Sequence, residues 1–261
     1  MKTVILAGGL GTRLMEETVV RPKPMVEIGG RPILWHIMRL YAAQGFGDFV
    51  VAGGYKGEMI KHYFLNYRLF SGDLHIDFAT GHVETRDDCD VDWRVEVVDT
   101  GSATQTGGRI RRLAPQLGRE RFFATYGDGV ADLDIGELLD FHKRHGRIAT
   151  VTAVRAPVES RLLPCPGAGI ADPSADGAPR WVNGGFFVFE PEIFDYIDGD
   201  ADALEQTALV KLARDGELMA YRHEGFWQCM DTLEERRLLE GLWASGLAPW
   251  ARVRGLTPAM D

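Results

Sequence analysis

An apolar run near the start of the chain ends at a glycine-rich turn, and this turn constrains the possible folds more than any other segment. Residues 4–14 read Val-Ile-Leu-Ala-Gly-Gly-Leu-Gly-Thr-Arg-Leu. The glycines at 8, 9 and 11 let backbone N–H groups approach a ligand, because no Cβ stands in the way. Successive N–H groups after a strand form an anion-binding nest. With the cations Arg13 and Lys23 close by in the sequence, the segment predicts a polyphosphate site.

Two familiar phosphate-binding patterns do not fit this turn. A P-loop closes with Lys-Ser/Thr, and no such pair follows the glycines. The dinucleotide fingerprint requires Gly-x-Gly-x-x-Gly, but Leu14 stands where the third glycine would be. A tight turn from strand to helix with two surface cations is the alternative interpretation of the same residues.

Short apolar runs alternate with helical patterns along the chain, which is typical of an α/β fold with a parallel sheet. The pattern predicts helices over 32–44 and 134–145, the first ending at Gly45 and the second capped by Asp132 or Asp134. We therefore expect a Rossmann-like, mixed and mostly parallel sheet flanked by helices. The predicted strands are Thr3–Ala7, Asp48–Ala52, Leu74–Ala79, Arg94–Val98, Phe122–Thr125, Ala149–Ala153 and Gly185–Phe189.

The 261 residues are enough for one large domain with a substantial core. We expect a single domain in which residues 1–150 mainly bind the nucleotide and residues 151–250 mainly bind a second substrate. Residues 154–181 contain five prolines and three glycines, which predicts an irregular loop.

Composition excludes several other classes of protein. A net charge of −9 argues against a general nucleic-acid-binding surface. The three cysteines are far apart and include no Cys-x-x-Cys pair, so neither a disulfide framework nor a zinc site is indicated. The sequence shows no signal peptide and no run long enough to span a membrane, so we expect a cytoplasmic protein that does not bind membranes.

Two aspartates lie where they could hold a metal ion. Asp128 sits between two glycines after a predicted strand, and Asp231 follows an aromatic and apolar run. Two carboxylates together with phosphate oxygens are typical ligands of Mg²⁺. The alternatives are an ordinary Asp-Gly turn for Asp128 and a helix N-cap for Asp231.

Other polar segments leave their roles open. Asn183-Gly184-Gly185 fits either a site for a hydroxylated ligand or a hairpin turn. Residues 106–109 read Thr-Gly-Gly-Arg and fit a loop whose backbone contacts a base edge. The pair His142 and His145 is interpreted as a surface feature of a helix rather than a metal site.

Taken together, these segments resemble the sugar-nucleotidyltransferase superfamily and, within it, the glucose-1-phosphate cytidylyltransferase family. The resemblance spans nearly the whole chain. Its main motifs occupy residues 6–14, 16–18, 23–30, 33–38, 54–57, 98–101, 106–109, 126–133, 183–187, 216–220, 225–228, 230–232 and 239–243.

The resemblance implies a role for each matching residue. Arg13 and Lys23 would be catalytic and face the α-phosphate and the pyrophosphate of CTP, while Asp128 and Asp231 would ligate Mg²⁺. The nucleotide would be bound by residues in the loop, near the base and near the metal, namely Leu6, Ala7, Gly8, Gly9, Gly11, Thr12, Arg13, Lys23, Thr106, Gly107, Gly127 and Asp128. The phosphorylated acceptor would be bound by Tyr126, Asn183, Gly184, Glu205 and Trp227.

One segment departs from the family pattern. Relatives carry a Glu-Lys-Pro element before the Asn-Gly-Gly-Phe segment, and its lysine contacts the sugar phosphate. Residues 154–181 contain no lysine, and their only cations are Arg155, Arg161 and Arg180. The nucleotide end therefore matches the family, while the acceptor end is changed.

The resemblance implies an enzyme of the cytidylyltransferase type, a symmetric homo-oligomer whose small-molecule partners are CTP and a phosphorylated acceptor. We expect transfer of CMP to glucose 1-phosphate, giving CDP-glucose and pyrophosphate. One alternative is transfer to a different phosphate or to a phosphonate, because the lysine motif is missing. The other is a catalytically degenerate homologue that only binds a nucleotide.

Overall fold

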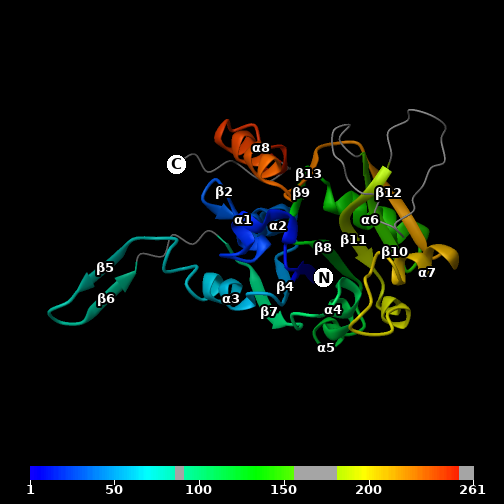
Figure 1. Ribbon diagram of the computed structural model, residues 1–261, viewed down its shortest axis with the longest axis horizontal. Helices are drawn as coiled ribbons and strands as arrows, with labels where there is room; N and C mark the ends of the chain where they lie inside the picture. The colour runs from blue at the N-terminus through cyan, green and yellow to red at the C-terminus, as the bar shows by residue number, and fades with distance from the viewer. Residues whose placement is uncertain (86–90, 156–180, 253–261) are drawn as a thin grey trace.

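The computed structural model describes residues 1–85, 91–155 and 181–252, and its centre is a seven-stranded sheet (Figure 1). The strand order is β12-β10-β11-β8-β1-β4-β7. Only β11 runs antiparallel to its neighbours, so the predicted mixed, mostly parallel sheet is confirmed. The strands are β1 (Thr3–Ala7), β4 (Asp48–Gly53), β7 (Arg94–Asp99), β8 (Phe122–Tyr126), β10 (Ala149–Arg155), β11 (Trp181–Phe189) and β12 (Leu218–His223).

The first strand lies in the middle of the sheet, and this position determines where ligands can bind. All five residues of β1 are buried, as expected for an apolar strand covered on both faces. Its end pairs with β4 through Ala7 and Gly53, and with β8 through Leu6 and Tyr126. The three strands are parallel, so the segments that follow them meet at one carboxyl edge, where open α/β sheets bind ligands.

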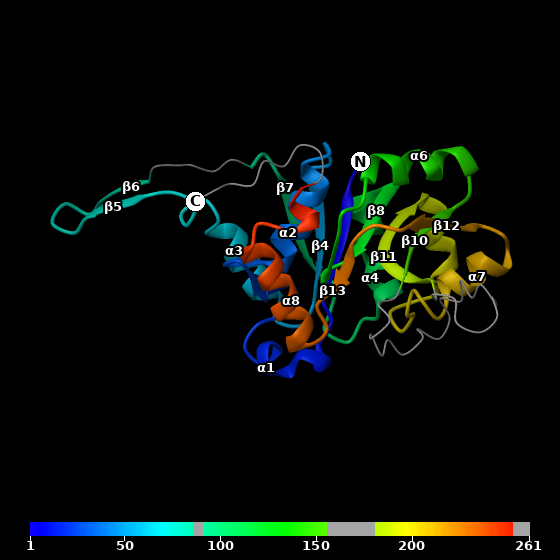
Figure 2. The same ribbon diagram turned by 90° about the horizontal axis from the view of Figure 1, so that it is seen from above.

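Helices cover both faces of the sheet (Figure 2). One face packs on α2 (Ile33–Ala42), α3 (Gly57–Leu65) and α6 (Ile135–His145), through a core that includes Ile37, Ile60 and Leu138. The other face packs on α4 (Thr106–Arg112), α5 (Ala114–Leu117) and α7 (Ala208–Arg214). The remaining helical segments are η1 (Thr12–Leu14), α1 (Met15–Thr18), η2 (Lys23–Met25), η3 (Pro191–Tyr196), α8 (Leu233–Ala244) and η4 (Pro249–Ala251).

Both predicted helices form, with small changes at their ends. In α2, Pro32 is the N-cap, and the helix ends at Ala42, before Gly45. In α6, Asp134 is the cap, because its Oδ1 accepts a hydrogen bond of 2.8 Å from the Glu137 N–H. The interpretation of His142 as a surface residue is wrong: its side chain is fully buried, with Nδ1 2.8 Å from the Thr150 hydroxyl.

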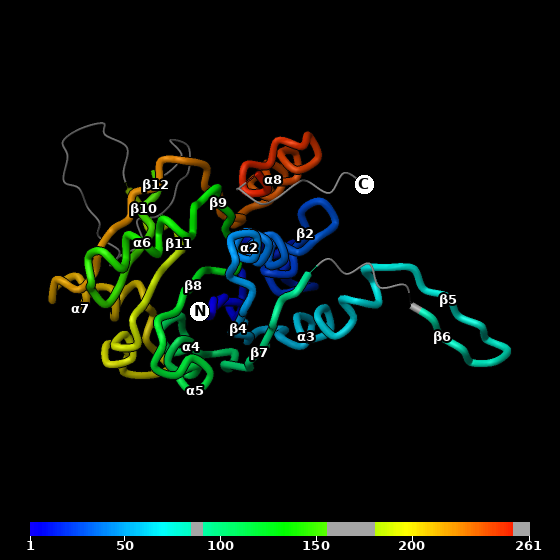
Figure 3. Tube along the Cα trace, turned by 180° about the vertical axis from the view of Figure 1, so that it is seen from behind, coloured from blue at the N-terminus to red at the C-terminus, as the bar shows by residue number. Residues whose placement is uncertain are grey.

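The predicted strand Leu74–Ala79 does not belong to the sheet, which corrects the expectation. It forms β5 (Leu74–Asp77), which pairs with β6 (His82–Thr85) in a hairpin that projects away from the body (Figures 1 and 3). Its alternating apolar residues match a strand pattern, but the pattern does not specify the partner. We call residues 65–85 the arm.

Besides the hairpin of β5 and β6, three pairings involve strands that the sequence analysis does not predict. β12 extends the sheet beside β10, and β2 (Glu27–Ile28) pairs with β3 (Arg31–Pro32). The third pair, β9 (Gly129–Ala131) with β13 (Trp227–Cys229), joins parts of the chain about a hundred residues apart. Of the two predicted metal-ligating aspartates, Asp128 directly precedes β9 and Asp231 lies two residues after the end of β13.

The single large sheet runs through both parts of the predicted division, because β10, β11 and β12 come after residue 148. The division into a nucleotide part and an acceptor part stays a prediction. Among the described helices, none is both long and apolar enough to cross a membrane.

His36 on α2 is a buried neutral histidine. Its Nε2 lies 2.8 Å from the Ile28 carbonyl, and its Nδ1 lies 3.3 Å from the Trp250 indole N–H. Because an indole nitrogen only donates, Nδ1 must accept and Nε2 must carry the proton. Burial lowers the pKa of His36 to about 4, against 6.5 for an ordinary histidine.

The lowered pKa of His36 predicts a loss of stability in acid. Below pH 6.5 the unfolded chain binds a proton at this residue that the folded protein does not bind until about pH 4. Between pH 7 and pH 5 the free energy of unfolding should therefore fall by about 2 kcal/mol through His36. Urea unfolding at pH 7 and pH 5 measures this fall in the free energy of unfolding. The fall should be smaller by about 2 kcal/mol in the His36→Gln variant. It should be unchanged in a His62→Gln variant, because His62 is exposed. An unchanged decline in His36→Gln would contradict the assignment.

Candidate functional site

A cleft of about 270 Å³ opens at the carboxyl edge of the sheet. The glycine-rich turn after β1 forms one wall, and residues that follow β8 form another. Gly11 adopts a φ of 63°, a conformation that glycine reaches without steric cost, and it precedes η1, which carries Arg13. The sequence therefore places backbone N–H groups and a guanidinium at the mouth of one cleft.

Most of the residues predicted to bind the nucleotide line this cleft. Gly107 does not line it, and its N–H donates to the Asp202 carbonyl at 2.9 Å. Its role near the base stays a prediction. The expectation that residues 106–109 form a loop is wrong, because they are the first turn of α4. Gly107 and Gly108 are needed there because a Cβ on either would collide with the backbone of Asp202 or Asp200.

Four charged side chains meet in the cleft. The Lys23 ammonium lies 2.6 Å from Asp128 Oδ2 and also contacts Asp231 Oδ1. The Arg13 guanidinium lies 2.8 Å from Asp231 Oδ2. Lys23 is 8% exposed and Asp231 is 6% exposed, whereas 68% of the Arg13 side chain is exposed. Buried charges remain in the folded state only when paired, and here each has a partner.

The pairing of β9 with β13 explains how the two aspartates meet. Asp128 precedes β9 and Asp231 follows β13, and the Met230 N–H donates to the Asp128 carbonyl at 2.8 Å. Burial by itself lowers the pKa of Lys23, but the charges and hydrogen bonds of Asp128 and Asp231 outweigh it and leave this pKa above 10.5. Lys23 is therefore a cation at neutral pH.

Asp231 is not the N-cap of the following helix. Thr232 caps α8, since its hydroxyl accepts from the Glu235 N–H at 3.2 Å. Glu235 completes a capping box by accepting from the N–H groups of Thr232, at 2.9 Å, and Asp231, at 2.6 Å. The helix end is thus satisfied by its neighbours, and the Asp231 carboxylate points to Lys23 and Arg13.

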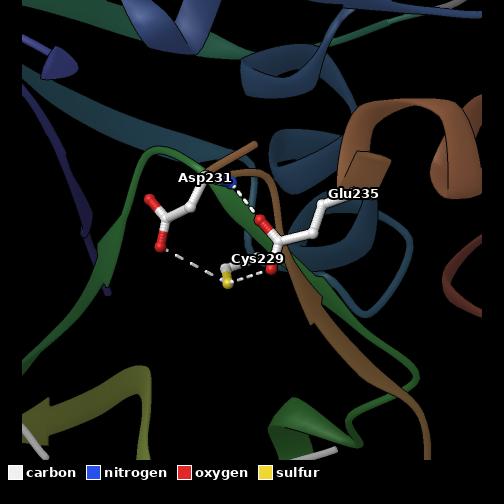
Figure 4. Close-up of side chains that lie close together, drawn as sticks. All are labelled: Cys229, Asp231 and Glu235. Carbon is white, nitrogen blue, oxygen red and sulfur yellow. Dashed lines mark hydrogen bonds between the residues drawn. The ribbon is translucent and has the colours of Figure 1, made fainter. Parts of the chain in front are cut away.

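Cys229, Asp231 and Glu235 form a compact group beside the cleft (Figure 4). The Cys229 sulfur lies 3.6 Å from Asp231 Oδ2 and 3.6 Å from Glu235 Oε1. Burial, followed by the nearby carboxylates, raises the pKa of the Cys229 thiol, so it stays protonated. The thiol donates to both carboxylates, and Glu235 Oε2 also accepts from the N–H groups of Asp231 and Thr232. We infer that this group orients the Asp231 carboxylate.

Arg109 is a buried residue in the wall of the cleft, and its guanidinium hydrogen-bonds to three loops. It donates to the carbonyls of Gly8 at 2.9 Å, Gly53 at 3.1 Å and Gly101 at 2.7 Å, and to the Thr100 hydroxyl at 2.7 Å. A Cβ on Gly8 would lie 2.1 Å from Arg109, so this glycine makes room for the guanidinium. A side chain of α4 therefore holds the glycine-rich turn in place through a hydrogen bond to the Gly8 carbonyl.

Replacing Arg109 by methionine should cost about 3 kcal/mol of unfolding free energy, because buried carbonyls lose a charged donor. The matched control is Arg112→Met on the same helix, where the guanidinium forms an exposed pair with Asp200. An exposed pair is worth about 1 kcal/mol or less. Urea unfolding curves of both variants measure the difference, and an equal loss in the two would contradict the role of Arg109.

The predicted acceptor residues form a hydrogen-bonded chain next to the cleft. Glu205 accepts from the Tyr126 hydroxyl and, at 2.9 Å, from the Thr106 hydroxyl. The Asn183 amide donates to the Tyr126 hydroxyl at 3.2 Å. Thr106, predicted to lie near the base, therefore connects to the residues predicted to hold the acceptor. Of the predicted acceptor residues, Tyr126 itself lines the cleft.

Asn183 and Gly184 lie within β11, so the alternative of a hairpin turn is wrong. The register between β10 and β11 shifts there, and the Asn183 Oδ1 accepts from the Gly185 N–H at 2.8 Å. The Trp227 indole donates to the Gly184 carbonyl at 2.7 Å. Trp227 is thus tied to the backbone of the same strand as Asn183.

Of the three arginines that could replace the missing lysine, Arg155 lies within the described residues. Arg155 pairs with Glu224 at 3.0 Å and stacks on the Trp181 ring, while Arg161 and Arg180 lie outside the described residues. Arg222 also stacks on Trp181, with its guanidinium carbon 5.4 Å from the ring centroid. Arg222 is not among the predicted site residues, because only the pairing of β10 with β12 brings it to this edge.

Glu235 is also not among the predicted site residues, and neither are two residues that contact the end of α1. The capping box Thr232-x-x-Glu235 is a readable signal and would have removed the N-cap alternative for Asp231. The two residues that contact the end of α1 lie in the segment after β4. The Tyr55 hydroxyl donates to the Thr18 carbonyl at 3.1 Å, and the Lys56 ammonium contacts the Val19 carbonyl.

Comparison with known families identifies the class of protein: the chain is a nucleotidyl transferase. The family model described as nucleotidyl transferase matches residues 2–162, which is more than half of the chain. Similar solved structures include HddC from Yersinia pseudotuberculosis complexed with GMP-PN, with a TM-score of 0.68 and 20% identity, covering 93% of this chain and 99% of that one. A putative glucose-1-phosphate thymidylyltransferase from Bacillus anthracis also has a TM-score of 0.68, at 16% identity, covering 100% and 98%.

Curated relatives narrow the family further. The chain is 52% identical to the glucose-1-phosphate cytidylyltransferase of Salmonella typhi over 96% of its own length and 98% of the relative. It is 41% identical to a probable glucose-1-phosphate cytidylyltransferase of Bacillus subtilis over 96% and 99%. The chain belongs to the glucose-1-phosphate cytidylyltransferase family of nucleotidyl transferases, which confirms the resemblance drawn from its motifs.

Proposed function

We propose that this enzyme transfers CMP from CTP to glucose 1-phosphate and releases CDP-glucose and pyrophosphate. The observation that carries the proposal is the meeting of Arg13, Lys23, Asp128 and Asp231 in the cleft beside the glycine-rich turn. The names of the relatives at 52% and 41% identity favour this acceptor over a different phosphate or phosphonate. They also count against a degenerate homologue.

The residues account for the chemistry by position and charge. A phosphate oxygen of the acceptor attacks the α-phosphorus of CTP, the bond from the α-phosphorus to the bridging oxygen breaks, and pyrophosphate leaves. The attacking oxygen is already anionic, so no side chain needs to remove a proton from it. Arg13 and Lys23 would bind the phosphates and stabilise the charge that builds up on the transition state and the leaving group.

A divalent cation fits the same site. Nucleotidyltransferases of this family generally use a divalent metal. In this chain Asp128 and Asp231 each direct one carboxylate oxygen to the same cationic group, the Lys23 ammonium. We propose Mg²⁺ as the metal, held by these two carboxylates, because Mg²⁺ prefers one or two carboxylates together with substrate phosphates. When bound, it would neutralise charge at the α-phosphate.

We propose that the acceptor binds beside this cleft, over the chain of Tyr126, Asn183 and Glu205. Hydroxyl, amide and carboxylate groups in one network suit the hydroxyl groups of a sugar. Among the described residues, Arg155 and Arg222 are cations at the same edge of the sheet, and they would serve the phosphate of the acceptor. We place cytosine near Thr106 at the start of α4.

We further propose that the protein is a homo-oligomer in which a second copy of the chain covers the arm. Phe70 is 79% exposed and Phe78 is 91% exposed, and no other described element packs on the hairpin where it projects. Such a hairpin is marginally stable in water by itself. Sedimentation velocity should show an oligomer that the Phe78→Asp variant weakens. A monomeric wild type, or an unaffected variant, would contradict this role.

A pyrophosphate-release assay tests the function. With CTP and Mg²⁺, glucose 1-phosphate should turn over at an ordinary enzymatic rate of about 1–1000 per second. Other nucleoside triphosphates and other phosphorylated acceptors, including phosphonates, form the comparison panel. Faster turnover with a non-sugar acceptor would replace glucose 1-phosphate in the proposal. Binding of CTP without turnover of any acceptor would favour the degenerate homologue.

A further inference from the structure

The Lys23 ammonium occupies the place where the metal would bind. It lies 2.6 Å from Asp128 Oδ2 and contacts Asp231 Oδ1, so it bridges the two carboxylates. A Mg²⁺ ion takes carboxylate oxygens at about 2.0–2.1 Å. A cation held by both oxygens would need the position that the ammonium fills. Lys23 and the metal therefore compete for the same two ligands.

The charges of the cluster add to this competition. Two carboxylates are balanced by the Lys23 ammonium and the Arg13 guanidinium, so the group is close to neutral before any ligand arrives. A neutral group attracts a divalent cation weakly, and the nearby ammonium repels it. Lys23 and Asp231 are both almost completely buried, so solvent screens this repulsion little.

A nucleoside triphosphate would resolve the competition. Arg13 and Lys23 line the same cleft as the glycine-rich turn, so phosphate oxygens bound there could take over both cations. Lysine is a point charge on a flexible four-carbon stem, and its ammonium can turn from the carboxylates to a phosphate without movement of the backbone. The φ angles on both sides of Lys23 are fixed by proline, because Pro22 is the N-cap of η2 and Pro24 follows Lys23 within it.

We propose that Lys23 acts as an internal substitute for the metal in the free enzyme, so that the divalent cation binds tightly only together with the nucleotide. The proposal rests on the proposed function for the identity of the nucleotide. The coupling is reciprocal: if CTP strengthens metal binding, the metal strengthens CTP binding by the same factor. The arrangement would keep the carboxylate pair from holding a metal ion when no substrate is present.

The test measures metal binding without catalysis. Mn²⁺ replaces Mg²⁺, and electron paramagnetic resonance reports free Mn²⁺ as protein is added in the absence of nucleotide. The Lys23→Met variant, which keeps an apolar stem and loses the charge, should bind Mn²⁺ about 10-fold or more tightly than wild type. Lys61→Met, at an exposed position on α3, should match wild type. The double variant Lys23→Met, Asp128→Asn should lose the gain, which assigns it to this site.

A second measurement adds a non-reactive nucleotide to wild type and to the Lys23→Met variant. Adding α,β-methylene-CTP, which cannot transfer CMP, should tighten Mn²⁺ binding to wild type. The factor by which the nucleotide raises the Mn²⁺ affinity should be smaller in Lys23→Met than in wild type. Equal Mn²⁺ affinity of Lys23→Met and wild type without nucleotide would overturn the proposal. That comparison contains no CTP, so its failure is distinct from a failure of the proposed function, which the pyrophosphate assay reports.

Discussion

Replacing Lys23 by alanine is expected to lower the turnover number with CTP and the acceptor by about 100- to 1000-fold. The ammonium is buried in the cleft next to Asp128 and Asp231, where a positive charge acts with little screening from solvent. Its loss removes a cation that would stabilise charge building up on the transferring phosphate and the leaving pyrophosphate. Steady-state pyrophosphate release at saturating CTP measures the effect.

The controls separate this effect from general damage. Lys61→Ala removes a lysine from the exposed face of α3 and should leave turnover within about 2-fold of wild type. Lys23→Arg keeps the charge but changes its shape, so it should recover only part of the activity. Near-UV circular dichroism in the presence of Mg²⁺ verifies that the variants are folded. Near-normal turnover of folded Lys23→Ala would remove Lys23 from the catalytic site.

Replacing Asp231 by asparagine is expected to have an effect of similar size on metal use. The substitution keeps the shape of the side chain and removes the charge that Lys23 and Arg13 share. We expect turnover to fall about 100-fold and the Mg²⁺ concentration for half-maximal rate to rise about 10-fold or more. A Mg²⁺ titration of the pyrophosphate-release rate gives both quantities.

The control for Asp231 lies on the adjacent helix. Glu234→Gln makes the same change from carboxylate to amide at an exposed position in the first turn of α8. It should leave both the rate and the Mg²⁺ requirement unchanged within about 2-fold, since a single exposed charge contributes little. A variant Asp231→Asn that kept the Mg²⁺ requirement of wild type would show that Asp231 does not hold the metal.

The nucleotide end of the site could be predicted because its signals are local. Gly8, Gly9 and Gly11 lie within one turn, and the chemistry of this turn depends on the absence of Cβ atoms at successive positions. Arg13 and Lys23 follow it closely. The buried run Thr3–Ala7 then fixes where the turn must lie, because a central parallel strand ends at the ligand-binding edge of the sheet.

The meeting of Asp128 with Asp231 can be proposed from the sequence, but residue spacing alone does not establish it. It depends on the pairing of Gly129–Ala131 with Trp227–Cys229, and strands this short carry no pattern that names a partner. For the same reason Arg222 cannot be predicted as a site residue, because it reaches the carboxyl edge of the sheet only through the long-range pairing of β12 with β10. Long-range register is set by packing of the whole sheet rather than by local sequence.

Two interpretations are wrong for the same physical reason, namely the surface position of His142 and the place of strand Leu74–Ala79 in the main sheet. The polarity of histidine favours a surface position for His142, yet its ring packs beneath the sheet and finds partners in Thr150 and, at 3.3 Å, Glu190. The residues of Leu74–Ala79 suit a strand, but they do not say which sheet the strand joins. In both cases the residue type limits the local conformation, while tertiary contacts decide the environment.

The most direct test follows the oxygen atoms of the acceptor. Glucose 1-phosphate labelled with ¹⁸O at its phosphate is incubated with CTP, Mg²⁺ and the enzyme, and the products are examined by mass spectrometry. Attack of the acceptor phosphate on the α-phosphorus predicts CDP-glucose that retains all of the label, together with unlabelled pyrophosphate. Absence of CDP-glucose while CTP is bound, or appearance of the label in pyrophosphate, would contradict the account.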